Sequence, residues 1–499
     1  MSVDQLTLDP KRWKALSIIA TAQLMMVLDS SIVNIALPKA SLDLGIPATS
    51  QQWVVTAYTL AFGSLLLLGG RVSDYLGRRR IFLIGLLGFA ASSAIGGLAT
   101  NGAMLFASRG LQGAFAAFMA PAGLSILSTT FTEGKERAKA FGVYGAISGG
   151  GAAIGLIAGG LLTEYANWRW CLLVNVPIAI ATWFAGRSVL HESVAKDGNS
   201  YDLPGAILVT GGLGALVYGF TLAELHGWGG TSTLLSIGGG VIALIAFIAY
   251  ERKAAEPLLP LRIVTNRNRG GSFLASFLVG TGMMAMFLFL TLYFQDVLGY
   301  SALKAGFSFL PFSLMVITMA TVSSKLLPRV GPRPLMVLGL LSGASGLFML
   351  SHIEVTSSYL THVLPACVLV AGGMGLSFVA FSSTALYGVH HHDAGVASAT
   401  LNAAQQVGGA LGLSLLYTLA HTASVNYLKG TFHGPPAAPG TPPGQLRPEL
   451  LHEAAVRGFQ VGFLGGSIAL VLAAIVAATF ITKDAGRMTA ADELVVAGF

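Results

Sequence analysis

Long apolar runs alternate with short polar segments over nearly the whole chain. Most of these runs hold about twenty residues, the length that a helix needs to cross a hydrocarbon core of about 30 Å. Backbone groups in lipid have only one another as partners, so each run is predicted to be a helix. The pattern predicts fourteen spans, near residues 15–37, 52–70, 80–99, 103–127, 138–162, 168–186, 204–223, 232–250, 270–294, 304–324, 334–351, 360–386, 395–424 and 458–481.

The composition agrees with an all-α polytopic membrane protein. Of the 499 residues, 54% are hydrophobic and only 10% are charged, against about 25% charged residues in a soluble domain. Cys171 and Cys367 both fall inside predicted spans, so neither a disulfide nor a metal site is expected. Three histidines, 390–392, stand beside Asp393 but lack further ligands. No catalytic nucleophile with a base is evident, and an enzyme is not predicted.

The positions of Lys and Arg predict the orientation. The net charge is +7, but the basic residues cluster in short loops between spans, which argues against nucleic acid as a partner. Placing both chain ends in the cytoplasm puts most of the 29 Lys and Arg on the inside, as the positive-inside rule requires. We therefore expect a multi-pass protein of the cell membrane with both termini cytoplasmic.

An internal repeat predicts the domain organisation. The loop from Arg71 to Arg79 follows the second span and is repeated from Lys325 to Arg333 after the tenth, with Gly77 aligned with Gly331. Such repeats around a midplane site are the architecture of secondary transporters. We expect a six-helix half at 1–190, an inserted two-helix segment with cytoplasmic connectors at 191–269, and a second six-helix half at 270–499 that carries a long outer loop, 425–457.

Asp29 is the leading candidate for chemistry, because it is an acid about ten residues from any other charge. A carboxylate inside a membrane is costly unless it is paired, wetted or protonated, and it marks a proton or cation site by default. Arg109, inside the fourth span, is the expected partner, and Asn34 and Gln112 are expected to share its polar cavity. The alternatives are helix capping or packing by Asp29, and an Arg109 side chain that reaches the outer interface.

The loop after the second span is the most specific motif. We expect Asp74 to meet a helix N-terminus of the other half in one state of the cycle, because a helix dipole favours negative charge there. A positive-inside loop with a turn glycine explains the arginines but not Asp74. The residues of this expected cytoplasmic gate are Gly70, Arg71, Asp74, Gly77, Arg78 and Arg79.

Two further sets of residues suggest helix contact and ligand contact. Glycines about four apart admit a neighbouring helix closely, which serves simple packing or a sliding interface; in the fifth span they are Gly151, Gly155, Gly159 and Gly160. Met and aromatic side chains suit varied apolar ligands, although core packing is the commoner use. Candidates for a substrate pocket are Met283, Met284, Met286, Phe287, Tyr293 and Gln405.

Over nearly its whole length the chain resembles the fourteen-helix drug:proton antiporters of the major facilitator superfamily, which include bacterial multidrug exporters. The segments that carry the resemblance are 28–38, 70–79, 109–113, 168–170, 175–177, 295–301, 404–412 and the glycines of the fifth span, where Leu156 stands in place of the usual proline. The resemblance implies the major facilitator fold, with two six-helix halves and two inserted helices. It also implies a role in proton coupling for Asp29 and in proton transfer for Arg109.

These observations predict a proton-coupled antiporter that exports amphipathic or hydrophobic molecules, including cationic ones, from the cytoplasm or the inner leaflet. No nucleotide-binding loop is present, so protons are expected to supply the energy and no cofactor is expected. The expected partners are small amphipathic molecules and membrane lipids, and the expected state is a monomer. The alternatives are a transporter of lipids or lipid-like metabolites, with or without proton coupling, and a membrane sensor that transports nothing.

Overall fold

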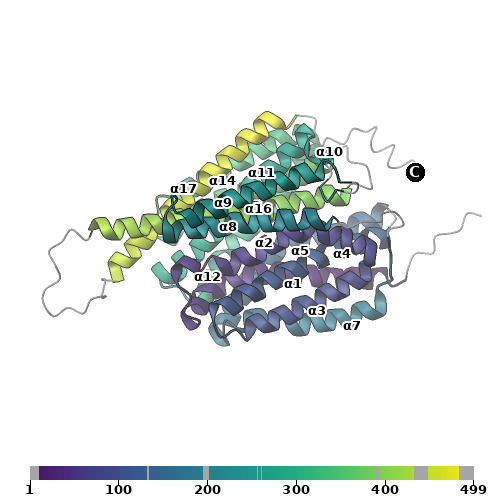
Figure 1. Ribbon diagram of the computed structural model, residues 1–499, viewed down its shortest axis with the longest axis horizontal. Coiled ribbons are helices and arrows are strands. Elements are labelled where there is room, and N and C mark those ends of the chain that lie inside the picture. Colours follow the sequence, from purple (N-terminus) through teal and green to yellow (C-terminus); the bar gives the residue numbers. More distant parts are fainter. Residues whose placement is uncertain are drawn as a thin grey trace, which may run out of the picture.

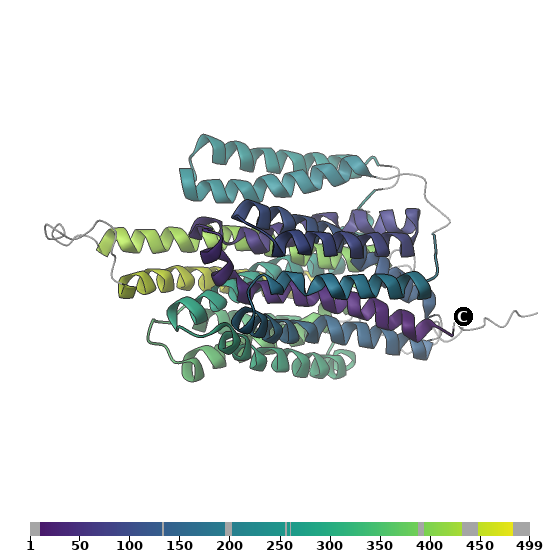
Figure 2. The ribbon, with the colours of Figure 1, turned by 90° about the horizontal axis from the view of Figure 1, so that it is seen from below.

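The computed structural model describes residues 10–131, 134–194, 202–254, 257–259, 261–387, 394–431 and 448–482. Within these ranges the protein is a bundle of long helices that lie side by side, without a strand (Figures 1 and 2). The first half contains α1 (Arg12–Asp43), η1 (Ala48–Ser50), α2 (Trp53–Leu76), α3 (Arg78–Gly97), α4 (Gly102–Thr130), α5 (Gly134–Tyr165), α6 (Trp170–Leu173) and α7 (Asn175–Val189).

The rest of the chain is also built from long helices. The inserted segment contains α8 (Leu203–His226) and α9 (Thr231–Glu251), followed by the short α10 (Leu261–Val264). The second half contains α11 (Arg267–Leu292), the π-helix η2 (Tyr293–Val297), α12 (Ala302–Ser308), α13 (Leu310–Val330), α14 (Pro332–Leu350), the π-helix η3 (Tyr359–Val363), α15 (Leu364–Leu386), α16 (Ala394–Thr431) and α17 (Pro448–Phe480).

The all-α membrane architecture predicted from the hydrophobic pattern is confirmed. In the described ranges, twelve helices are long and apolar enough to cross a membrane, and α5 and α16 are long helices at the two remaining predicted positions. The described helices enter the segment 425–457 that was predicted to be an outer loop: α16 continues to Thr431 and α17 begins at Pro448. Helix α17 runs without a break from Pro448 to Phe480, so no separate helix precedes the last span within the described residues.

Small residues bring the helices of each half together. In the first half, a Cβ on Gly113 of α4 would lie 2.2 Å from the Tyr58 carbonyl oxygen of α2. In the second half, a Cβ on Gly280 of α11 would lie 2.0 Å from the Gln405 carbonyl oxygen of α16. No other residue fits such contacts, so these glycines serve close helix packing in lipid.

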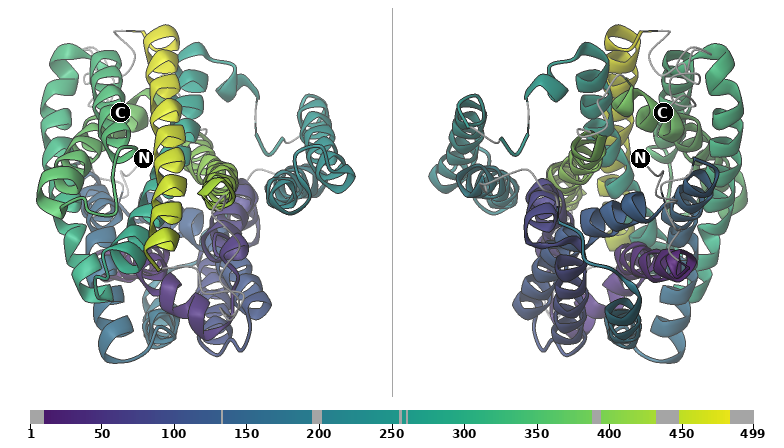
Figure 3. Two further views of the ribbon diagram at one scale, coloured as in Figure 1. Left: turned by 90° about the vertical axis from the view of Figure 1, so that its left-hand side faces the viewer. Right: turned by 90° about the vertical axis from the view of Figure 1, so that its right-hand side faces the viewer.

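The inserted pair stands at the side of the bundle, as Figure 3 shows. Helices α8 and α9 pack on each other, and α8 also contacts α2 and α16. The Ser414 hydroxyl of α16 donates to the Val217 carbonyl oxygen of α8 at 3.2 Å. The pair therefore rests on helices of both halves, outside the region in which the halves face each other.

The two ends of the bundle differ in how the halves meet. The end at which α1 begins, beside the arginines at 12, 78, 79 and 187, is here called the basic end. At the opposite end, Gln295 Nε2 donates to the Ile35 carbonyl oxygen at 3.0 Å, and the Tyr417 hydroxyl donates to the Ala48 carbonyl oxygen. These contacts join α1 and η1 of the first half to η2 and α16 of the second, so the bundle is closed at the opposite end.

Candidate functional site

A buried polar cluster surrounds Asp29 in the first half. The Asp29 carboxylate is fully buried and accepts three hydrogen bonds. Arg109 Nη1 donates to Oδ2 at 2.5 Å, Gln112 Nε2 donates to Oδ1 at 2.9 Å, and Asn175 Nδ2 donates to Oδ1 at 2.8 Å. Helices α1, α4 and α7 thus supply one acid, one cation and two amides to a site that water does not reach.

Arg109 is held by more than its ion pair. Its Nε donates to the Val54 carbonyl oxygen at 3.0 Å, and its Nη1 also donates to Gln112 Oε1 at 2.8 Å. The guanidinium lies 4.4 Å from the centre of the Tyr58 ring, a cation–π contact. Because Arg109 is only 1% exposed, the interpretation that its side chain reaches the interface is wrong.

The local sequence explains how these groups meet. Arg109 and Gln112 are three residues apart on α4, so they share one face of that helix. The sixth predicted span is broken at Val174 into α6 and α7, which places Asn175 at the first position of α7. Asn175 Oδ1 is buried without a hydrogen-bond partner among the described residues. The orientation that lets Asn175 Nδ2 donate to Asp29 therefore leaves the oxygen of the same amide without a donor.

Sequence reasoning placed Asn34 in this cluster and did not include Asn175 or Ser93. Asn34 Nδ2 instead donates to the Ser30 carbonyl oxygen on its own helix, at 3.1 Å. Gln112 Nε2 also donates to Ser93 Oγ, at 2.7 Å, which extends the cluster to α3. Serine is common in membrane helices, so Ser93 gives no signal in the sequence, whereas Asn175 stands alone as an amide in an apolar run.

The arrangement can exchange a proton only by rearranging. Arginine stays charged in proteins, so a proton that binds Asp29 must compete with the guanidinium for the same carboxylate. A buried ion pair is poor evidence for stability, because desolvation offsets most of the attraction. An ionisable pair inside a membrane is instead typical of a functional site.

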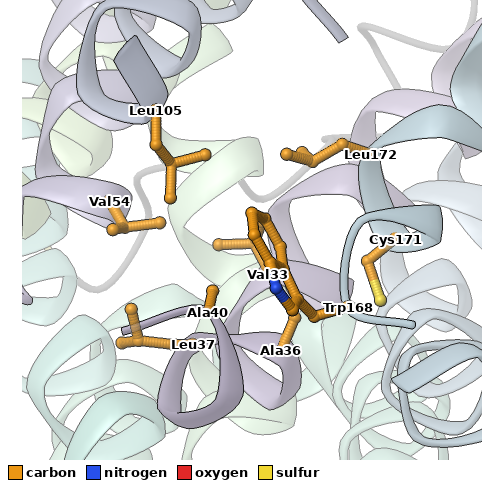
Figure 4. A pocket seen from close by; sticks show the side chains of 9 residues that line it. All are labelled: Val33, Ala36, Leu37, Ala40, Val54, Leu105, Trp168, Cys171 and Leu172. Atoms are coloured by element: carbon orange, nitrogen blue, oxygen red, sulfur yellow. The ribbon is translucent and has the colours of Figure 1, made fainter. Parts of the chain in front are cut away.

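Figure 4 shows an apolar pocket between the helices of the first half, and its lining residues lie about one helical turn from the cluster, toward the opposite end. Val33 follows Asp29 by one turn, and Leu105 and Cys171 precede Arg109 and Asn175 by one turn. The volume that the centre of a water molecule could occupy in this pocket is about 10 Å³. This is about the smallest volume that holds one water, and a buried water also needs polar groups to bind it. The side chains that line it are Val33, Ala36, Leu37, Ala40, Val54, Leu105, Trp168, Cys171 and Leu172.

Because the pocket is small and apolar, we expect it to keep water at the opposite end from reaching Asp29. We expect Leu105→Ser to admit water and to raise severalfold the rate at which a small membrane-permeant thiol reagent modifies Cys171, measured in a Cys367→Ser background. Leu105→Ala is the matched control, because an enlarged apolar cavity stays dry. Equal rates in the Ser and Ala variants would show that the pocket does not keep water from Asp29.

The loop between α2 and α3 forms contacts inside the first half. Arg78 Nε donates to Asp74 Oδ1 at 2.8 Å, so in this state Asp74 is engaged by its own loop. Glu192, which the sequence analysis did not include, accepts the Arg79 and Arg80 backbone N–H groups at 3.0 and 3.1 Å. The contact of Asp74 with the other half stays a prediction for another state of the cycle.

Gly77 is required by both its conformation and its surroundings. Its φ is +104°, and a Cβ there would lie 2.7 Å from the Glu192 carboxylate. Gly331, its counterpart in the repeat, also has a positive φ of +76°. Both glycines stand between two helices, at the junctions of α2 with α3 and α13 with α14, so the repeat seen in the sequence is also a repeat of backbone geometry.

The glycines of α5 serve two different contacts. A Cβ on Gly151 would meet Val27, one on Gly155 would meet Ser31, and one on Gly159 would meet Ile32. All three partners belong to α1, so these glycines pack α5 inside its own half. A Cβ on Gly160 would lie 2.7 Å from the Leu303 Cα of α12, in the other half. Only this last glycine of the set belongs to the interface that must open and close.

Glu164 completes the contact between α5 and α12. Its Oε2 accepts the Leu303 backbone N–H at 3.0 Å. Hydrogen bonds from the Ser301 hydroxyl and from the Leu303 N–H lower the pKa of Glu164 below its usual value. The ionised form is favoured in this closed arrangement, so protonation of Glu164 would weaken the closure at the opposite end.

The residues expected to line a substrate pocket divide into two groups. Met286 and Tyr293 are fully buried core residues, and the Tyr293 hydroxyl donates to the Glu354 carbonyl oxygen at 2.8 Å, so in this state both belong to the core and their lining role stays a prediction. The half-buried residues of the set are Met283, Met284, Phe287 and Gln405. The Phe287 ring packs against Phe309 and Phe312.

One stretch of the sequence resembles a metal site, and it lies outside the described residues. The histidines 390–392 and Asp393 belong to the segment 388–393, which the structure does not describe. Across the ranges that it does describe, no group of three or more His, Cys, Asp or Glu side chains is arranged to hold a metal ion.

A bundle of this kind, with a buried ion pair in one of two repeated halves, defines a membrane transporter. The family model of the Major Facilitator Superfamily matches residues 19–413, and the chain belongs to this superfamily. It is 47% identical to the puromycin resistance protein of Streptomyces alboniger, over 97% of this chain and 94% of that protein. It is 42% identical to the cephamycin export protein of Amycolatopsis lactamdurans, over 81% of this chain and 84% of that protein.

Solved structures agree with this fold. A bacterial homologue of the human lysosomal transporter Spinster aligns with a TM-score of 0.63 at 15% identity, over 96% of this chain and 99% of that chain. At such low identity the likeness concerns the fold alone.

Proposed function

We propose that the protein is a proton-coupled antiporter that exports amphipathic antibiotics or related secondary metabolites from the cytoplasm or the inner leaflet. The buried contact of Arg109 with Asp29 is the observation that supports coupling most directly. The names of the relatives, which refer to resistance to or export of puromycin and cephamycin, support the substrate class.

In the proposed cycle, Asp29 alternates between Arg109 and a proton. With the opposite end closed, Asp29 is ionised and bound to Arg109, and the substrate enters between the halves from the basic end. When the halves rock and the contacts of Gly160 and Glu164 with α12 separate, the apolar pocket wets and a proton reaches Asp29. Proton binding releases Arg109 and favours the state that discharges the substrate, because a ligand shifts an equilibrium by its differential affinity.

The proposal includes the placement of the protein in the cell membrane. The basic end, with both termini, faces the cytoplasm, and the opposite end faces outward, in agreement with the positive-inside rule. One proton that crosses about 100 mV supplies about 2.3 kcal/mol, so neither a nucleotide nor another cofactor is required. We propose that the chain works as a monomer among lipids, that its partners are small amphipathic molecules, and that it is not an enzyme.

Flux measurements in proteoliposomes test this function. We expect an imposed pH gradient to drive accumulation of labelled puromycin, and puromycin to drive proton movement that a trapped pH-sensitive dye reports. Vesicles without protein are the control. Flux that ignores the pH gradient would contradict antiport, and flux of a fluorescent lipid without flux of puromycin or a cephamycin would favour the lipid transporter.

A further inference from the structure

Two buried carboxyl groups meet at the basic end of the inserted helix pair. Asp202, 7% exposed, caps α8 through its Oδ1, which accepts the Gly205 N–H at 2.8 Å. Glu251, 3% exposed, is the last residue of α9. Their carboxyl groups accept the N–H groups of two adjacent residues, Leu258 and Leu259, which brings the two acids together. The two acids therefore face each other across the open end of a helical hairpin.

Backbone groups satisfy part of this pair, but one oxygen has no donor. Asp202 Oδ2 accepts the Leu258 N–H at 3.3 Å, and Glu251 Oε2 accepts the Leu259 N–H at 3.0 Å. Glu251 Oε1 is buried without a hydrogen-bond partner among the described residues. An ionised carboxylate only accepts hydrogen bonds, so two ionised carboxylates cannot satisfy each other, whereas a protonated one donates an O–H.

The cations nearby do not neutralise the pair. Arg71 of α2 uses its Nη2 to donate to the Pro257 carbonyl oxygen at 3.2 Å. Arg252 and Lys253 directly follow Glu251, and both are exposed. None of the ion pairs within 4.0 Å that the described residues form includes Asp202 or Glu251. Two carboxylates that meet without a cation repel each other, which favours a protonated form of the pair.

We propose that Asp202 and Glu251 together bind one proton and so form a protonation site at the basic end, separate from Asp29. The Glu251 carboxyl holds the proton on Oε1 and donates it to the Asp202 carboxylate. In this form the pair binds residues 258 and 259 by their N–H groups, and Arg71 binds residue 257 of the same segment. The protonated pair thus ties the inserted helices to the last turns of α2, where Arg71 lies.

Loss of this proton would place two negative charges in a buried site. Repulsion would then loosen the segment 257–259 and its contact with Arg71. A state that holds an extra proton gains stability as the pH falls and loses it as the pH rises, because stability follows the difference in bound protons between the folded and unfolded states. The site therefore responds to a rising pH at the basic end and does not depend on the transport cycle proposed above.

Infrared titration of the purified full-length protein in detergent tests this proposal. We expect the wild type to show the C=O stretching band of a protonated carboxyl group at neutral pH, and this band to disappear as the pH rises. Glu251→Gln should lose the band while it keeps the fold, because the amide can donate to Asp202 as the protonated acid does. We also expect the melting temperature of the wild type to fall as the pH rises, and the melting temperature of Glu251→Gln to stay constant over the same pH range.

Asp202→Asn is the second variant, because asparagine still caps α8. Glu449→Gln, at an exposed acid of α17, is the matched control and should keep both the band and the pH dependence. A wild type without the band at neutral pH, or a Glu251→Gln variant that keeps it, would overturn the proposal. So would a melting temperature that follows the sodium concentration and not the pH, since the pair would then hold a cation. None of these outcomes depends on flux, so the transport proposal is judged separately.

Discussion

Asp29→Asn is expected to reduce proton-driven export to the level of vesicles without protein. Asparagine keeps the size of the side chain and its hydrogen bonds to amides, but it neither binds a transportable proton nor carries the charge that holds Arg109. The measurement is puromycin accumulation driven by a pH gradient in proteoliposomes. Export at the wild-type rate would exclude Asp29 as the coupling site.

The same substitution is expected to lower stability, and this effect can be separated from the loss of coupling. Removing one partner of a buried ion pair leaves the other charge uncompensated, which costs about 3–5 kcal/mol. Arg109 is 1% exposed, so it falls in this class. The double variant Asp29→Asn with Arg109→Gln removes both charges and should recover most of the melting temperature without recovering proton-driven export. A double variant that pumps protons would contradict the assigned role of the pair.

Gly160→Leu is expected to prevent closure of the opposite end. A Cβ at Gly160 would lie 2.7 Å from the Leu303 Cα and 2.9 Å from the Ala302 carbonyl oxygen, and a backbone cannot yield as a side chain does. Overpacking costs about 1–3 kcal/mol. This cost falls only on the closed state, so the equilibrium should shift roughly 5- to 150-fold toward a state that is open there.

Labelling by an impermeant thiol reagent measures this shift. A cysteine introduced at Gln295, whose side chain contacts Ile35 across the closed interface, should react faster in the Gly160→Leu variant, and export should fall with it. Gly151→Ala is the control on the same helix, because its Cβ would meet only side chains inside the first half, Val27 at 3.0 Å and Leu24 at 3.3 Å. Equal effects of the two substitutions would mean that Gly160 is a packing residue like Gly151.

Parts of the site were predictable because an unusual residue type in an apolar run is itself a signal. Asp29 and Arg109 are charges inside predicted spans, and in lipid each must find a partner. Gln112 lies one turn from Arg109 on the same helix, so its place followed from helical geometry. Asn34 met the same criteria on α1, but in this structure its amide bonds to the backbone of its own helix and not to Asp29, so its role stays a prediction.

The remaining partners depend on contacts between helices that are far apart in the chain. Asn175 reaches Asp29 because the sixth span breaks at Val174, and although Pro177 is a local signal for such a break, it does not show which side chain the break brings to Asp29. Glu192 and Glu164 are ordinary polar residues at helix ends, and only tertiary packing places them against the α3 N-terminus and against α12. For the same reason Met286 and Tyr293, which suit a ligand site by composition, lie in the core.

The sequence by itself determined the class of this protein, the positions of its helices and which charged residues lie inside the membrane. Each segment that enters lipid must have a certain length, must satisfy its own backbone hydrogen bonds and must bear the energetic cost of any charge, and these requirements act on each segment alone. The tertiary structure decided which of these residues meet, which glycine faces the other half, and which carboxyl groups are left to share a proton. Such choices arise from packing between segments, where a difference of one helical turn changes the partner of a side chain.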